Sequence, residues 1–135
     1  MSSYKPARVL WNLTPSGTIL TLSGAATTNG PTFSLTDISD VWLAVNVTGT
    51  PTGTTPTLDV GLDIQDPDGN WYLAVAKITQ LTTTAGRGSA YAGLHMPNVA
   101  STSAALVLPN TGRVSWTLGG TTPVYPQTSI CLIGR

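Results

Sequence analysis

The amino-acid sequence predicts an all-β fold, an antiparallel β-sandwich or jelly roll of roughly eight to ten short strands. Three observations predict it. The 135 residues include 23 threonines, 14 glycines and 10 prolines but no glutamate, so β-branched residues and turn formers outnumber helix formers. Several segments alternate apolar and polar residues with period two. Segments rich in Gly, Pro and Thr recur about every ten residues, which is typical of short strands joined by turns.

The first thirty residues have the weakest strand pattern. Short β-like runs at Arg8–Leu13 and Thr18–Ser23 are separated by a Pro-Ser-Gly break. We therefore expect residues 1–30 to form an extended N-terminal arm or short strands. Residues 31–135 are expected to form the β-sandwich domain, since the whole length is normal for one domain.

Two central segments have the clearest strand pattern. The odd-numbered positions of Val41–Thr48 are all Val or Leu. In Leu58–Gln65 the even-numbered positions are apolar and the odd-numbered ones are Asp, Gly, Asp and Gln. Because successive side chains of a strand point to opposite faces, both segments predict strands with one face in the core.

A β-hairpin is expected directly after the second of these strands. Asp66–Asn70 has the composition of a tight turn, and Trp71–Thr79 returns as a strand. Alternation in the returning strand puts Trp71, Leu73 and Val75 on one face.

The same turn contains the best metal candidate. Asp63, Asp66 and Asp68 surround Gly69, and calcium prefers oxygen ligands on a glycine-containing loop. The spacing lacks the alternation and the closing glutamate of an EF-hand, and Asp-Pro-Asp-Gly-Asn is also ordinary turn chemistry. Both interpretations stay open at the sequence level, with no metal expected.

The C-terminal half predicts further strands between Gly- and Thr-rich loops. Thr82–Gly88 and Gly119–Pro126 are expected to be loops. The expected strands are Ala90–Met96, Ala104–Leu108, Arg113–Leu118 with Val114, Trp116 and Leu118 inward, and Thr128–Ile133.

One four-residue motif occurs twice in the sequence. Gly53–Pro56 and Gly120–Pro123 are both Gly-Thr-Thr-Pro, and each lies between two predicted strands. We interpret them as the same turn chemistry used at two places in one sandwich.

Charge and cysteine content exclude several classes of function. Charged residues make up 9% of the chain, against about 25% in typical soluble domains, and the formal net charge is zero. Nucleic-acid binding requires clustered Lys and Arg, so no nucleic-acid partner is expected. The only cysteine, Cys131, is expected to be a small buried hydrophobe. The sequence has neither an apolar signal-peptide region at Met1–Pro6 nor an 18-residue apolar stretch, so no membrane partner is expected.

Catalytic residue patterns are nearly absent. His95 is the only histidine, and no carboxylate lies within fifteen residues of it. The sequence therefore predicts a protein that is not an enzyme and has no cofactor and no catalytic residues.

Candidate interface residues take the place of catalytic ones. Trp42 lies on the face opposite Val41 and Leu43 and is expected to anchor an intersheet or intersubunit contact. Arg87 lies between two glycines and fits a basic contact loop. Tyr4 and Arg8 belong to the N-terminal segment that could reach a neighbouring subunit. The four tryptophans Trp11, Trp42, Trp71 and Trp116 otherwise fall in predicted strands, where packing in the core is expected.

Several motifs resemble small structural proteins of tailed bacteriophages. Gly53–Val60 followed by Asp66–Trp71 is similar to their Gly-Thr-Thr-Pro strand and Asp/Gly turn before Trp. Arg113–Thr117, then Gly120–Pro123, then Ile130–Ile133 is similar to their C-terminal region. The resemblance covers about residues 38–135. It implies a head decoration, or capsid cement, protein that carries no catalytic residues.

Such proteins clip neighbouring major capsid subunits together on the outside of an HK97-fold shell, often as trimers. The resemblance thus implies the major capsid protein as partner, a homo-trimer or other homo-oligomer, and a place on the outer surface of a virion assembled in the bacterial cytoplasm. Two alternatives remain open: a tail or baseplate structural protein, and a carbohydrate-binding β-sandwich module with aromatic side chains on one exposed strip.

Overall fold

The computed structural model describes residues 5–14, 20–95 and 103–135 and confirms the all-β fold. Ten strands and no helix occur in these residues, so none of their segments is a helix that could cross a membrane. The strands are β1 (Arg8–Asn12), β2 (Leu20–Ser23), β3 (Thr27–Asn29), β4 (Phe33–Ser34), β5 (Asp40–Val47), β6 (Thr52–Gln65), β7 (Trp71–Lys77), β8 (Gly86–Gly93), β9 (Ser103–Ala105) and β10 (Thr111–Gly134).

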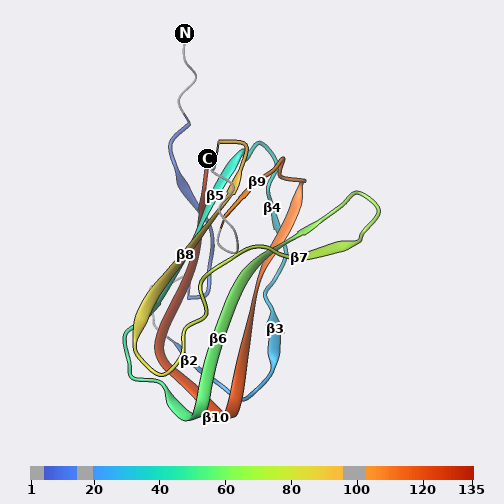
Figure 1. Ribbon diagram of the computed structural model, residues 1–135. Coiled ribbons are helices and arrows are strands. Elements are labelled where there is room, and N and C mark those ends of the chain that lie inside the picture. The colour runs from blue at the N-terminus through green and yellow to red at the C-terminus, as the bar shows by residue number, and fades with distance from the viewer. Residues whose placement is uncertain (1–4, 15–19, 96–102) are drawn as a thin grey trace.

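The long last strand organises the fold (Figure 1). β10 has 24 residues, and its two halves belong to two layers that share a core. Its first half pairs with β6 on one side and with β3 and β4 on the other. Its second half pairs with β5 on one side and with β1 and β2 on the other. A single hydrogen-bonded sheet therefore folds back on itself at the bend of β10, with β7 and β8–β9 outermost.

Alternating side chains from the two layers fill the core, as the strand patterns predict. The even-numbered side chains Leu58, Val60 and Leu62 of β6 are buried, and so are the odd-numbered apolar side chains of β5. Val114, Trp116 and Leu118 of β10 point inward. Trp116 stacks on Trp11 with 6.0 Å between ring centroids, so β1 covers one side of the core.

The two Gly-Thr-Thr-Pro segments pair with each other, which corrects the interpretation of both as turns between strands. Thr54 lies opposite Thr121, inside the continuous strands β6 and β10. The pairing register shifts on both sides of Thr121, so each segment is an irregular, bulge-like part of its strand.

The two segments have the same backbone conformation at corresponding residues. Gly53 and Gly120 have φ of 111° and 96°, and Thr55 and Thr122 have φ of 47° and 46°. A Cβ on Gly53 would approach the carbonyl oxygen of Thr122 to 2.6 Å, and one on Gly120 would approach that of Thr55 to 2.5 Å. Only glycine allows the two backbones to approach this closely in this conformation.

Strand β7 departs from the alternation that the sequence predicts. Ala74 has φ of 51°, and the pairing with β6 shifts between Leu62 and Ile64. Leu73 is consequently 67% exposed, whereas Trp71 and Val75 are half-buried. The prediction that these three side chains share one face is therefore wrong for Leu73. The hairpin itself is present, since β6 and β7 pair antiparallel.

The segment after β7 also differs from the prediction. β8 begins at Gly86, so the end of the predicted loop Thr82–Gly88 is a strand paired with β5. β9 is shorter than the predicted strand Ala104–Leu108 and pairs parallel to β8, which makes the sheet mixed.

The N-terminal residues that the structure describes lie against the rest of the chain. β1, β2 and β3 each pair antiparallel with β10. The division into residues 1–30 and 31–135 remains a prediction, but the short-strand alternative describes these three segments.

Candidate functional site

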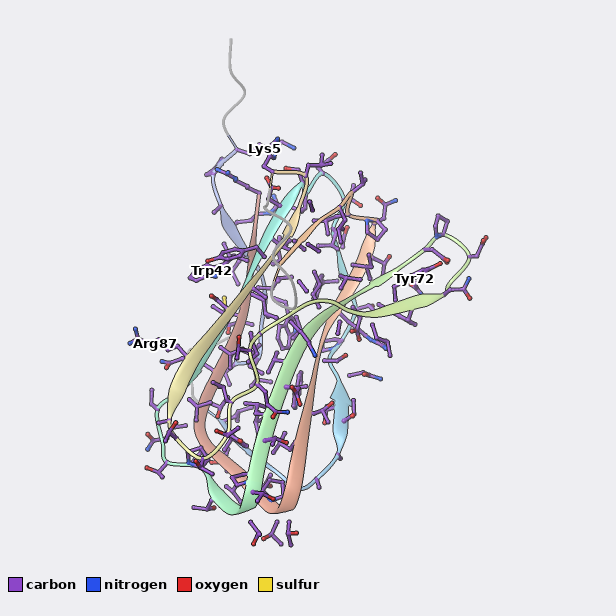
Figure 2. All side chains as sticks on the ribbon, in the orientation of Figure 1. Lys5, Trp42, Tyr72 and Arg87 are labelled. Atoms are coloured by element: carbon purple, nitrogen blue, oxygen red, sulfur yellow. The ribbon has the colours of Figure 1, made fainter. Side chains whose placement is uncertain are left out.

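Two of the predicted interface residues line one shallow pocket on the outer face of β5, β8 and β10. Trp42 and Arg87 border it, and Asn46 pairs with Arg87 across the two strands. Figure 2 shows Trp42 and Arg87 on the same side of the molecule, away from Tyr72. Trp42 is exposed, so the prediction of an intersheet contact is wrong and the intersubunit contact stays a prediction.

Tyr91 belongs to the same surface and was not predicted. It lies directly opposite Trp42 in the β5–β8 pair. Alternation over Arg87, Ser89 and Tyr91 is a weak signal because the inward positions between them are Gly and Ala. The pairing register that brings Tyr91 to Trp42 cannot be obtained from one sequence.

Arg8 lies at a different place, at the end of the molecule where β1 begins and β10 ends. There, Lys5, Arg8 and Arg135 line a second shallow pocket beside Asp37. The Lys5 ammonium donates a hydrogen bond to the Asp37 carbonyl at 3.0 Å. Tyr4 lies outside the described residues. The predicted interface residues are thus divided between an outer-face pocket and a basic end, and their contact roles remain predictions.

His95 has a carboxylate neighbour that its sequence position does not reveal. Its Nδ1 lies 2.8 Å from Oδ2 of Asp40, and its backbone N–H donates to Oδ1 of the same carboxylate at 3.0 Å. Burial raises the pKa of Asp40, but the hydrogen bonds from His95 outweigh it, and the pKa lies below its ordinary value. Ser39 Oγ donates to this carboxylate at 3.4 Å. The pair therefore ties the end of β8 to the start of β5.

Asp63 is the centre of a polar network that holds the hairpin. Its carboxylate is almost fully buried, and it accepts hydrogen bonds from Arg113 Nε at 2.9 Å, Ser115 Oγ at 2.6 Å and the backbone N–H of Ala74 at 2.9 Å. The guanidinium of Arg113 lies 4.0 Å from the centroid of the Trp71 ring. This network explains why the chain bulges at Ala74.

The geometry does not support the calcium candidate. Asp63 is used by the network with Arg113, whereas Asp66 caps the hairpin turn through the backbone N–H groups of Asp68 and Asn70, both at 2.9 Å. The bond from Asn70 lowers the pKa of Asp66 below its ordinary value. No cluster of three His, Cys, Asp or Glu side chains suited to a metal occurs in the described part of the chain.

Cys131 borders the outer-face pocket but has the character of a structural thiol. It is half-buried, and burial raises the pKa of its thiol, which disfavours the reactive thiolate.

Comparisons with known proteins add little beyond the fold class. No family model and no curated protein matches the sequence. Among solved structures, the chain is similar to the SPBc2 prophage-derived protein YomS, with 8% identity, a TM-score of 0.38 and coverage of 98% of this chain and 99% of YomS. It is also similar to a carbohydrate-binding module of glycoside hydrolase family 9 (Cel9A) from Ruminococcus flavefaciens FD-1, with 10% identity, a TM-score of 0.34 and coverage of 88% and 100%. Neither similarity is close enough to support an argument about function.

Proposed function

We propose that this chain is a non-catalytic structural protein of a tailed-phage virion, and specifically a decoration protein on the outside of an HK97-fold head. One observation carries the proposal. The motifs that resemble phage structural proteins form one connected unit, in which the two Gly-Thr-Thr-Pro segments pair and the Asp66–Trp71 turn continues into the network with Arg113.

The basic end is the proposed contact with the shell. Three of the six cationic side chains of the chain, those of Lys5, Arg8 and Arg135, border one pocket together with a single acidic residue, Asp37. Arg135 Nε also lies 3.9 Å from Oδ2 of Asp40, so Lys5 and Arg8 are the cationic side chains that fit an acidic patch on a major capsid subunit. Many copies on a symmetric lattice would then stabilise the shell by avidity, although each contact is weak.

Co-sedimentation with empty heads tests the proposal. The purified chain should bind expanded heads of the virus that encodes it, and raised salt should weaken binding because exposed charges are screened. Lys5→Glu should reduce the bound fraction at moderate salt. Lys77→Glu is the matched control, since Lys77 is exposed on β7 and should leave binding unchanged.

Three outcomes would contradict parts of the proposal. Failure of the unmodified chain to bind expanded heads contradicts the decoration role. Binding to purified tails and not to heads favours the tail or baseplate alternative. An equal loss with Lys5→Glu and Lys77→Glu removes the basic end as the contact and leaves the decoration role standing.

A further inference from the structure

A continuous row of apolar side chains crosses the outer face of four strands. The pairing register places Val9 opposite Ile133, Ile133 opposite Trp42, and Trp42 opposite Tyr91. Directly paired residues project from the same face, with Cβ atoms roughly 5 Å apart. Val9 is 58% exposed, Trp42 41% and Tyr91 39%, so two exposed aromatic side chains project from neighbouring positions of β5 and β8.

Three of these strands, β5, β8 and β10, also form the base and the opposite rim of the outer-face pocket. Two residues further along each strand are the small side chains Ala44, Ser89 and Cys131; two residues beyond these are the polar side chains Asn46, Arg87 and Ser129. The pocket between Trp42 and the polar rim has a volume of about 360 Å³, and Tyr91 lies opposite Trp42 at its edge. The rims are four residues apart, or roughly 13 Å along a strand, which accommodates a short oligosaccharide.

The polar side chains of the pocket are available to a ligand. Asn46, Arg87, Ser89 and Ser129 form no hydrogen bond or ion pair with another described residue. Together they offer an amide, two hydroxyls and a guanidinium, that is, both donors and acceptors. A purely apolar partner would have to remove these groups from water without replacing their hydrogen bonds, which is costly.

A pyranose sugar matches both halves of this surface. One face of the ring is made of C–H groups that pack on aromatic rings, and its hydroxyl groups donate and accept hydrogen bonds. A nucleic acid fits less well, because Arg87 is the single cation among the residues that line the pocket and phosphate contacts require several.

We infer that the outer face of β8, β5 and β10 is a binding site for a pyranose oligosaccharide, which stacks on Trp42 and Tyr91 and hydrogen-bonds to Asn46 and Arg87. This inference does not depend on the proposed virion role, because the basic end and this pocket share no lining residue.

Titration with defined sugars tests the site. Chitohexaose, cellohexaose, laminarihexaose and mannohexaose are titrated into the full chain, with tryptophan fluorescence and isothermal calorimetry as readouts. At least one sugar should bind and change the tryptophan emission. Trp42→Ala and Tyr91→Ala should each weaken that binding by about tenfold or more, which corresponds to roughly 1.4 kcal/mol. Trp42→Phe should retain part of it, because a ring face remains.

Tyr72→Ala is the matched control for Tyr91→Ala, since Tyr72 is exposed on the opposite hairpin and should leave sugar binding unchanged. Circular dichroism melts verify that each variant is folded. The inference is overturned if none of the four sugars binds, or if binding survives Trp42→Ala and Tyr91→Ala in folded protein. It is also overturned if light scattering shows that the chain self-associates through this face and loses the association in Trp42→Ala.

Discussion

At the scale of single residues, two buried aspartates connect parts of the chain that are far apart in sequence. Asp63 joins β6, β7 and β10 through Ala74, Arg113 and Ser115. Asp40 joins the start of β5 to His95 beyond β8. In a chain with only 9% charged residues, these two carboxylates are structural and not solubilising.

Asp63→Ala should lower the free energy of unfolding by about 3 kcal/mol, because it leaves a buried guanidinium without its partner. Urea denaturation monitored by tryptophan fluorescence measures the change. Asp59→Ala is the control: its carboxylate accepts one hydrogen bond, from Gln80, and its loss should cost about 1 kcal/mol or less. Equal effects of the two substitutions would show that the network does not hold the hairpin.

Asp40 should make stability depend on pH in the acid range. Its pKa is lowered in the folded protein, so its contribution is complete above its ordinary pKa of about 4 and is lost as the pH falls through the lower, folded value. Asp40→Asn should therefore have a lower Tm than the unmodified chain near neutral pH, and the difference should shrink below about pH 4. A Tm difference that is constant from neutral to acid pH would contradict this role.

At the scale of elements, the matched Gly-Thr-Thr-Pro segments are the central irregularity of the sheet. They pair through Thr54 and Thr121, and each glycine faces the carbonyl oxygens of the opposite segment. The bend of β10 follows from this pair, since the strand changes partners from β6 to β5 just beyond it.

Substitution of the two glycines separates backbone strain from close packing. Gly53→Ala and Gly120→Ala should each destabilise the fold by about 2 kcal/mol or more, because a methyl group would enter left-handed backbone and press on a carbonyl oxygen. Gly24→Ala is the control: Gly24 has φ of 87° but nothing within 4 Å of its Cβ position, so only the strain of about 1 kcal/mol applies. Thermal and urea unfolding measure the three variants, and equal losses would show that the close approach contributes nothing.

At the scale of the whole molecule, both layers depend on the last strand of the chain. The second half of β10 pairs with β1, β2 and β5, and its side chains Ile130 and Leu132 are fully buried. The first layer needs only the first half of β10, which pairs with β3, β4 and β6, but the second layer has no central strand until β10 is complete. Folding that relies on such distant pairings is slow compared with that of helical domains.

Removal of residues 124–135 should abolish cooperative folding. The truncated chain keeps the partners of β6 but leaves β5 without its β10 partner and exposes the core face of β5. Differential scanning calorimetry should show no cooperative transition, and a dye that binds exposed apolar surface should fluoresce. A sharp transition in the truncated chain would show that the β6–β7–β10 unit folds by itself.

The sequence by itself determined the all-β class, the strands over residues 41–47 and 58–65, the inward face of residues 114–118 and the hairpin turn, because local alternation and turn chemistry act within a few residues. It also placed Trp42 on the face of its strand opposite Val41 and Leu43. The tertiary structure decided the rest: the pairing of the two Gly-Thr-Thr-Pro segments, the bulge at Ala74, the Asp40–His95 contact and the placement of Tyr91 beside Trp42. Each of these depends on strand register between residues that are distant in the chain, and register is set by packing of the whole sheet.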